Sequence, residues 1–176
     1  MAKYVAFLRA INVGGHVVTM ENLRKLFSGL KFSNVETFIA SGNVIFETKS
    51  APDHRLEQKI EKHLEAALGY EVGTFVRSTE EIRAISEYPA FSKEALKLAR
   101  AVHVGLMRKN LSADELQQAK IFASDADDFR VEGREVYWLC RIPTNESKFP
   151  RKFEKLVDSA VTYRNINTMT RLAAKF

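Results

Sequence analysis

The chain has 176 residues, of which 45% are hydrophobic and 28% are charged, and these fractions are typical of a folded globular protein. Its single cysteine, Cys140, excludes an internal disulfide framework and a zinc cluster built from cysteines. The net charge of +5 is concentrated toward the two ends of the chain, which suits a phosphate or nucleic-acid partner; the alternative is a mildly basic solvated surface.

The first half of the chain predicts the element order βαββαβ. Residues 4–11 are rich in β-forming side chains and end at a glycine loop. Thr19 then caps a helix with one apolar face. A second helix begins near Asp53 and ends at Gly69, and residues 71–77 form the fourth strand.

The middle strands of this half form a predicted hairpin over residues 37–47. Gly42 and Asn43 indicate a two-residue turn of type II′, whose twist matches the strands on either side. The pairs that this turn predicts are Ser41 with Val44 and Ile39 with Phe46.

The same element order then starts again. Residues 78–81 and 112–115 are capping boxes, and the first opens a helix that stops before Pro89. Later elements are a strand at 100–108, a hairpin around Gly133, a helix at 149–161, an extended segment at 162–166 and a helix at 168–174. The sequence therefore predicts an α+β fold of two ferredoxin-like halves, residues 1–78 and 99–176, joined by a helical connector at 79–98. The second half ends in a C-terminal helix.

Four segments carry small or charged polar side chains that a packed core does not require. These candidate ligand-binding residues are Arg9, Asn12, Gly14 and Gly15; Ser41, Gly42 and Asn43; Ser147 and Lys148; and Arg164, Asn165, Asn167 and Thr168.

Each segment has two interpretations. The backbone N–H groups around Gly14 and Gly15 suit an anion, or the glycines serve only a turn with positive φ. Ser147 and Lys148 suit an oxyanion or a nucleophile–base pair, or Ser147 only caps a helix.

The last segment is also open to two interpretations. Arg164 with its amide and hydroxyl neighbours suits a phosphate, a carboxylate or a base edge. Alternatively, this segment ties down the last strand and caps the last helix through Asn167 or Thr168. Arg9, near the end of the first strand, either emerges at the rim of the sheet or pairs with another group.

Other motifs of catalysis are absent from the sequence. No metal-ligand spacing, dinucleotide fingerprint, P-loop or GxSxG elbow occurs, so no cofactor is assigned. A solvated acidic turn accounts for Asp125, Asp127 and Asp128. His103 and Cys140 are expected in the core. With neither a signal peptide nor a membrane span in the sequence, we expect a soluble cytoplasmic protein.

Taken together, several segments resemble a known bacterial family, "domain of unknown function 1697". The segments, in chain order, are FLRAINVGG, MENLRKLF, VETFIASGNVIFET, VRSTEEI, and NESK with TYRNINTMTRL. The resemblance implies an α+β protein of two ferredoxin-like halves, and it implies no activity. The family motifs correspond to the candidate ligand-binding residues named above.

The leading hypothesis is a protein that binds a small anionic or nucleotide-like ligand in a cleft between the two halves. The residues expected to converge there are Arg9, Ser41, Asn43, Lys148 and Arg164. One alternative is an enzyme that acts on a phosphorylated or carboxylated metabolite through Ser147 or Lys148. Another is sequence-tolerant nucleic-acid binding through the basic ends of the chain. A purely structural role for the polar motifs is the fourth.

Overall fold

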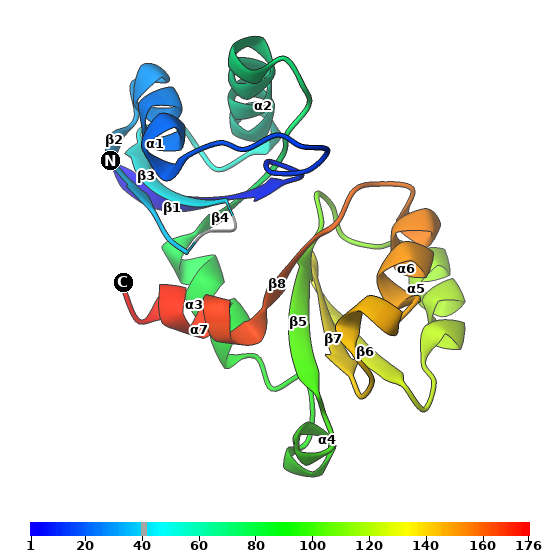
Figure 1. Ribbon diagram of the computed structural model, residues 1–176. Coiled ribbons are helices and arrows are strands. Elements are labelled where there is room, and N and C mark those ends of the chain that lie inside the picture. Colours follow the sequence, from blue (N-terminus) through cyan, green and yellow to red (C-terminus); the bar gives the residue numbers. More distant parts are fainter. Residues whose placement is uncertain (40–41) are drawn as a thin grey trace. The chain divides into compact units, whose positions relative to one another are not determined.

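The computed structural model describes residues 1–39 and 42–176, and these residues form two compact units (Figure 1). The first unit contains Met1–Ile82 together with Phe176, and the second contains Arg83–Lys175. Each unit contains a four-stranded antiparallel sheet with helices, so the chain is a mixed α+β protein.

Helices and strands are interspersed along the chain. The elements up to α3 are β1 (Ala2–Arg9), α1 (Met20–Gly29), β2 (Ser33–Thr37), β3 (Asn43–Thr48), α2 (His54–Leu68), β4 (Gly73–Ser78) and α3 (Thr79–Glu87). They are followed by α4 (Lys93–Lys97), β5 (Ala101–Leu106), α5 (Ala113–Ala119), β6 (Asp127–Glu132), β7 (Glu135–Cys140), α6 (Phe149–Val157), β8 (Thr162–Asn165) and α7 (Ile166–Ala173). Short 3₁₀ turns lie at Lys120–Phe122 and Thr144–Glu146.

The first sheet has the strand order β2-β3-β1-β4, with β1 between two partners. Successive side chains of a strand point to opposite faces, so Ala6 and Leu8 of β1 share one face. That face packs against Phe27 of α1 and Ile60 of α2, and all four side chains are almost fully buried. Burying one large apolar side chain contributes about 1.5–3 kcal/mol, so this core accounts for much of the unit's stability.

The predicted helix signals of this unit are confirmed. Thr19 caps α1, and its Oγ1 accepts a hydrogen bond from the backbone N–H of Asn22 at 3.1 Å. Asp53 caps α2 through an Oδ1 that accepts from the Leu56 N–H at 3.1 Å. Gly69 ends α2 in the left-handed conformation, with φ of +83°.

The predicted two-residue hairpin turn is wrong. Thr37 pairs with Val44, so the connection between β2 and β3 runs over residues 38–42. The Phe38 N–H donates to the Asn43 carbonyl at 2.9 Å, and the Asn43 side-chain amide donates to the Phe38 carbonyl at 2.9 Å. This pair of bonds stabilises a wider loop than the one that Gly42-Asn43 alone indicates. Ser41, the predicted partner of Val44, lies outside the described residues.

The predicted pair of Ile39 with Phe46 is wrong for the same reason. Ile39 lies in the wider loop with a left-handed φ of +58°, which is incompatible with an extended strand. Phe46 pairs with Tyr4 of β1, and its ring lies 5.7 Å from the ring of Phe27. The strand itself was correctly predicted, but its apolar residues do not specify the register with β2.

The second sheet has the strand order β6-β7-β5-β8. One face carries Trp138 and Cys140, both fully buried, against Phe149 and Phe153 of α6. The rings of Trp138 and Phe149 are stacked with centroids 5.7 Å apart. The predicted hairpin around Gly133 and the core position of Cys140 are confirmed.

Both predicted capping boxes are confirmed. Ser78 and Glu81 exchange hydrogen bonds of 2.8 and 3.1 Å at the start of α3. Ser112 and Glu115 do the same at 2.7 and 3.1 Å at the start of α5. The short helix α4, capped by Ser92, was not predicted.

The two sheets repeat one plan down to single residues. In each, the fourth strand lies at an edge and runs directly into a helix, α3 or α7. Arg77 pairs with Val5 on the first sheet, and Arg164 pairs with Val104 on the second. Both arginines are buried, and each donates from Nη1 to the carbonyl of the residue before it, at 3.0 and 2.9 Å. The repeat therefore includes the helix after the fourth strand.

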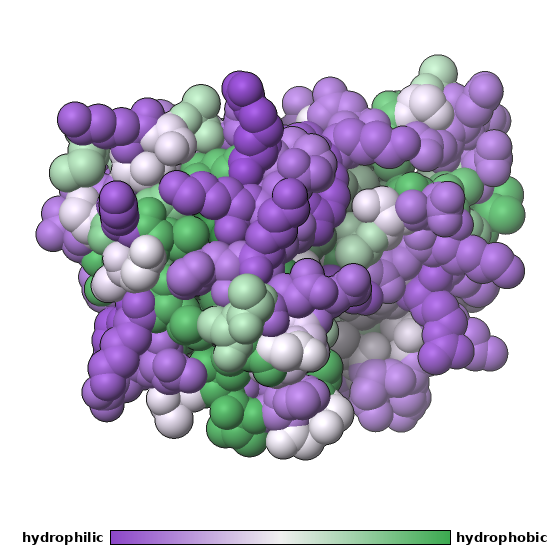
Figure 2. Space-filling model, turned by 90° about the horizontal axis from the view of Figure 1, so that it is seen from above, coloured by the Kyte–Doolittle hydropathy of each residue, from purple (hydrophilic) through white to green (hydrophobic). Residues whose placement is uncertain are grey.

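Hydrophilic side chains cover most of the face of the molecule that Figure 2 shows. A few large apolar side chains are exposed, among them Val17 and Ile121. No helix in the described part of the chain is long and apolar enough to cross a bilayer.

Candidate functional site

The described candidate residues of the first unit lie where β1 ends and β3 begins. The Leu8 N–H donates to the Gly42 carbonyl at 2.8 Å, which joins the end of β1 to the hairpin loop. Asn12 Oδ1 accepts from the Val18 N–H at 2.8 Å and closes the loop before α1. Asn12, Gly42 and Asn43 line one cavity of about 20 Å³, which holds about one water molecule. The structure brings these three residues together around a space too small for a metabolite.

The glycines of this region have backbone conformations that favour glycine. Gly14 and Gly15 have φ of +64° and +83°, as the turn interpretation requires, and anion binding by the backbone N–H groups of this loop stays a prediction. Gly42 has φ of +77°, and a Cβ there would lie 3.1 Å from Leu8 Cβ and 3.0 Å from Ile11 Cγ2. The backbone of the hairpin loop therefore approaches β1 closely only because residue 42 is glycine.

Asn43 and Arg9 occupy different environments at this end of the sheet. Asn43 is fully buried, and its amide bond to Phe38 stabilises the loop. Arg9 is half-buried opposite Gly73, at the last pair of β1 with β4, so it lies at the end of the strand.

In the second unit, Ser147 begins a buried hydrogen-bond network. Its Oγ donates to Asp127 Oδ1 at 2.7 Å and accepts from the Phe149 N–H at 3.1 Å. Trp138 Nε1 donates to the same carboxylate oxygen at 2.8 Å. The expectation that Asp127 belongs to a solvated turn is wrong, because its carboxylate anchors the start of α6 and is only 7% exposed. No local sequence signal connects Asp127 with Ser147, which lies 20 residues later.

Ser147 and Lys148 do not form a nucleophile–base pair in this geometry. The Ser147 hydroxyl hydrogen is directed to Asp127, and its oxygen accepts from the Phe149 N–H. The prediction that Ser147 caps the helix is wrong by one residue, because the N-cap of α6 is Lys148. Lys148 is exposed. In the described part of the chain, no group of three or more His, Cys, Asp or Glu side chains is arranged to hold a metal ion.

Lys148 is instead the first member of a basic face on α6. Arg151, Lys152 and Lys155 follow it at helical spacings of three, four and seven residues, so the four side chains share one face. All four are exposed, and among the described residues none has an acidic partner. The first turn of α6 contains no acidic residue of its own, so no carboxylate of this turn offsets the basic side chains. Sequence analysis included Lys148 and missed the other three, although their spacing is visible in the sequence.

Arg164 is held inside the second unit. Its Nη1 donates to Thr162 Oγ1 and to the Tyr163 carbonyl, both at 2.9 Å, and burial lowers the pKa of its guanidinium to about 10. Asn165 caps α7, and its Oδ1 accepts from the Asn167 N–H at 2.9 Å. The prediction that Asn167 or Thr168 is the cap is wrong, because β8 runs into α7 without a loop.

His103 lies nearer the surface than predicted. It is half-buried on β5, and its ring stacks on Trp138 with centroids 5.0 Å apart. Its Nδ1 and the hydroxyl of Tyr163 are buried without hydrogen-bond partners. Burial lowers the pKa of His103 and raises the pKa of the Cys140 thiol.

The chain is similar to known proteins over most of its length. One solved structure, described as that of conserved bacterial protein SP0830 from Streptococcus pneumoniae, is similar over 99% of this chain and 98% of that chain. The TM-score is 0.74 and the sequence identity is 19%, so the likeness shows a shared fold. No curated protein matches the chain. A family model described as "Protein of unknown function (DUF1697)" matches residues 1–137, which confirms the resemblance seen in the sequence motifs. The chain belongs to the DUF1697 family.

Proposed function

We propose that the protein binds a phosphate-bearing anionic ligand on the basic face of α6, formed by Lys148, Arg151, Lys152 and Lys155. The observation that carries the proposal is that these four exposed cations lie on one helix face without acidic partners in the described chain. Unpaired cations near the start of a helix add their charge to that of the helix dipole, and both attract phosphate oxygens.

The helix start is rigid enough to present these groups. Ser147 is fixed by its bonds to Asp127 and to the Phe149 N–H, and Phe149 is buried against Trp138. Exposed lysines on a mobile segment lose conformational entropy when they bind, whereas lysines on a fixed helix lose only side-chain freedom.

A thermal-shift screen with inorganic phosphate, nucleotides and phosphorylated sugars tests this function. A ligand that binds only the native state raises the melting temperature by mass action. Lys148→Ala and Lys152→Ala are expected to reduce the shift, whereas Lys62→Ala, which removes an exposed lysine from α2, is the matched control. Shifts that are equal in all three variants would place the ligand elsewhere.

Nucleic-acid binding is the second candidate, and the length of the basic face supports it. Seven residues of helix span about 10 Å, and a nucleic-acid strand advances about 3.4 Å per phosphate along the axis of a duplex. We expect binding of a labelled oligonucleotide to weaken as salt rises, and each lysine removed from this face to lower the salt slope by about one. No binding at low salt would exclude this candidate.

We further infer that each unit has ferredoxin-like topology. The support is the order of four antiparallel strands, in which the first strand lies between the third and the fourth in each sheet. A bacterial cytoplasmic location remains part of the proposal, as does an enzymatic role for Ser147 or Lys148. Loss of turnover in Lys148→Ala with the fold retained would support the enzymatic role.

A further inference from the structure

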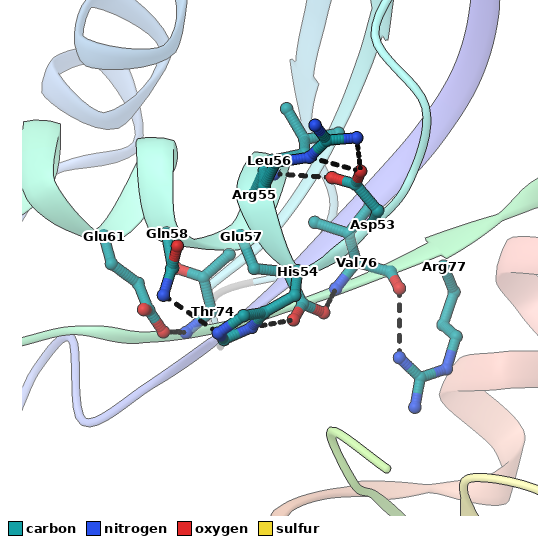
Figure 3. Close-up of polar contacts among 10 residues, drawn as sticks. All are labelled: Asp53, His54, Arg55, Leu56, Glu57, Gln58, Glu61, Thr74, Val76 and Arg77. Carbon is teal, nitrogen blue, oxygen red and sulfur yellow. Dashed lines mark hydrogen bonds and ion pairs between the residues drawn. The ribbon is translucent and has the colours of Figure 1, made fainter.

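Side chains, rather than another strand, close the outer edge of β4. This strand pairs with β1 on one side only, so the N–H groups of alternate residues point away from the sheet. Carboxylates accept all three of these groups in β4. The bonds are Thr74 N–H to Glu61 Oε1 at 2.8 Å, Val76 N–H to Glu57 Oε1 at 2.9 Å and Ser78 N–H to Glu81 Oε2 at 2.8 Å. Figure 3 shows the first two, which reach β4 from α2.

The spacing of helix and strand explains how one helix supplies two caps. Glu57 and Glu61 are one helical turn apart, which is a rise of about 6 Å. Thr74 and Val76 are two strand residues apart, which is about 6.8 Å. The two distances match closely enough for consecutive turns of α2 to meet consecutive outward N–H groups.

A backbone carbonyl at the centre of this edge is also hydrogen-bonded to a side chain. The Val76 carbonyl accepts from Arg77 Nη1 at 3.0 Å, so both backbone groups of Val76 are bonded to side chains. Glu57 is only 3% exposed, and Arg77 is fully buried. A strand from another molecule would have to displace these bonds to pair with β4.

The second unit uses the same device in a reduced form. Glu154 Oε1 of α6 accepts from the Val161 N–H at 2.8 Å, just before β8. Proline occupies position 150, one helical turn before Glu154, so α6 offers no second carboxylate at that spacing. Arg164 again donates to the carbonyl of the preceding residue. Recurrence in both units indicates that closing this edge is a property of the repeat.

We propose that Glu57, Glu61 and Glu81 take the place of a neighbouring strand and prevent β4 from pairing with the β4 of a second copy of the chain. Unprotected edge strands are templates for strand addition, and an antiparallel β4–β4 pair is self-complementary about a two-fold axis. The second copy is therefore the partner that these carboxylates exclude.

The double variant Glu57→Ala with Glu61→Ala tests the proposal. We expect light scattering to show an apparent mass that rises from one chain toward two as concentration increases. Hydrogen exchange at Thr74 and Val76 is expected to become about tenfold faster or more in the dilute monomer, since each amide loses a charge-assisted bond.

Two controls separate edge closure from general destabilisation. Glu57→Gln with Glu61→Gln keeps an acceptor oxygen at each position and is expected to retain the mass behaviour of the unmodified chain. Glu65→Ala removes the next carboxylate along α2, which is exposed and accepts no strand N–H in the described chain. If the double alanine variant does not fold, Glu61→Ala alone, at a half-buried position, takes its place. A folded alanine variant whose mass does not rise with concentration would overturn the proposal.

Discussion

Replacing Gly42 by alanine tests the close approach of the hairpin loop to β1. The new Cβ would lie 3.1 Å from Leu8 Cβ and 3.0 Å from Ile11 Cγ2. Leu8 cannot move away easily, because its N–H is bonded to the Gly42 carbonyl and its side chain is 2% exposed in the core. Gly42 also has a left-handed φ of +77°, so alanine meets two separate costs there.

The expected loss of stability is the sum of those costs. A residue with a Cβ in the left-handed region costs about 1–2 kcal/mol. Overpacking a buried site costs about 1–3 kcal/mol more. Gly42→Ala is therefore expected to lower the free energy of unfolding by about 2–5 kcal/mol.

Urea denaturation of Gly42→Ala and Gly15→Ala separates the two costs. Gly15 has φ of +83°, and a Cβ there would have no atom within 4 Å, so its variant carries only the backbone cost of about 1–2 kcal/mol. The difference between the two variants measures the overlap with Leu8 and Ile11. If Gly42→Ala is no more destabilising than Gly15→Ala, the described loop geometry is refuted.

Three other substitutions have expected outcomes. In Gly105→Ala the new Cβ would lie 2.7 Å from side chains that flank β5, so we expect a loss of about 1–3 kcal/mol by urea denaturation; a neutral result would show that the flanking side chains yield freely. Ser147→Ala removes the bond to Asp127 and the acceptor of the Phe149 N–H, with an expected loss of about 1–2 kcal/mol; an unchanged melting curve would contradict the network. Burial lowers the pKa of His103 in the folded chain below the ordinary value of 6.5. The unfolded chain therefore binds a proton at a higher pH than the folded chain does, and the free energy of unfolding decreases as the pH falls below about 6.5. His103→Gln is expected to reduce the fall between about pH 7 and about pH 5, and an identical fall would rule out this contribution.

The sequence predicted most of the elements because their signals are local. Thr19, Asp53 and Gly69 act within one turn of a helix, and the capping boxes span four residues each. Runs of β-forming apolar residues identified the central strands, which are buried on at least one face. These signals depend only on residues that are close in the sequence, so they can be recognised without the tertiary structure.

The failures involve contacts between residues that are distant in sequence or bonds that the pattern does not encode. The hairpin register depends on the Asn43 amide, which equally suits a turn residue in a tighter loop. The burial of Asp127 depends on Ser147 and Trp138, 20 and 11 residues away. Of the candidate site, the polar motifs identified Lys148 but not the basic face that continues from it, because Arg151, Lys152 and Lys155 belong to no motif and are related to Lys148 only by helical spacing.

The only tryptophan and the only cysteine of the chain both lie in β7. Trp138 is 1% exposed and Cys140 is fully buried, so selectively excited tryptophan fluorescence and thiol labelling both report on the second unit and not on the first. Circular dichroism reports on the helices of both. Melting curves from the probes of the second unit and from circular dichroism will therefore coincide only if the two units unfold together. The unmodified chain can thus be used to measure whether the two units unfold cooperatively.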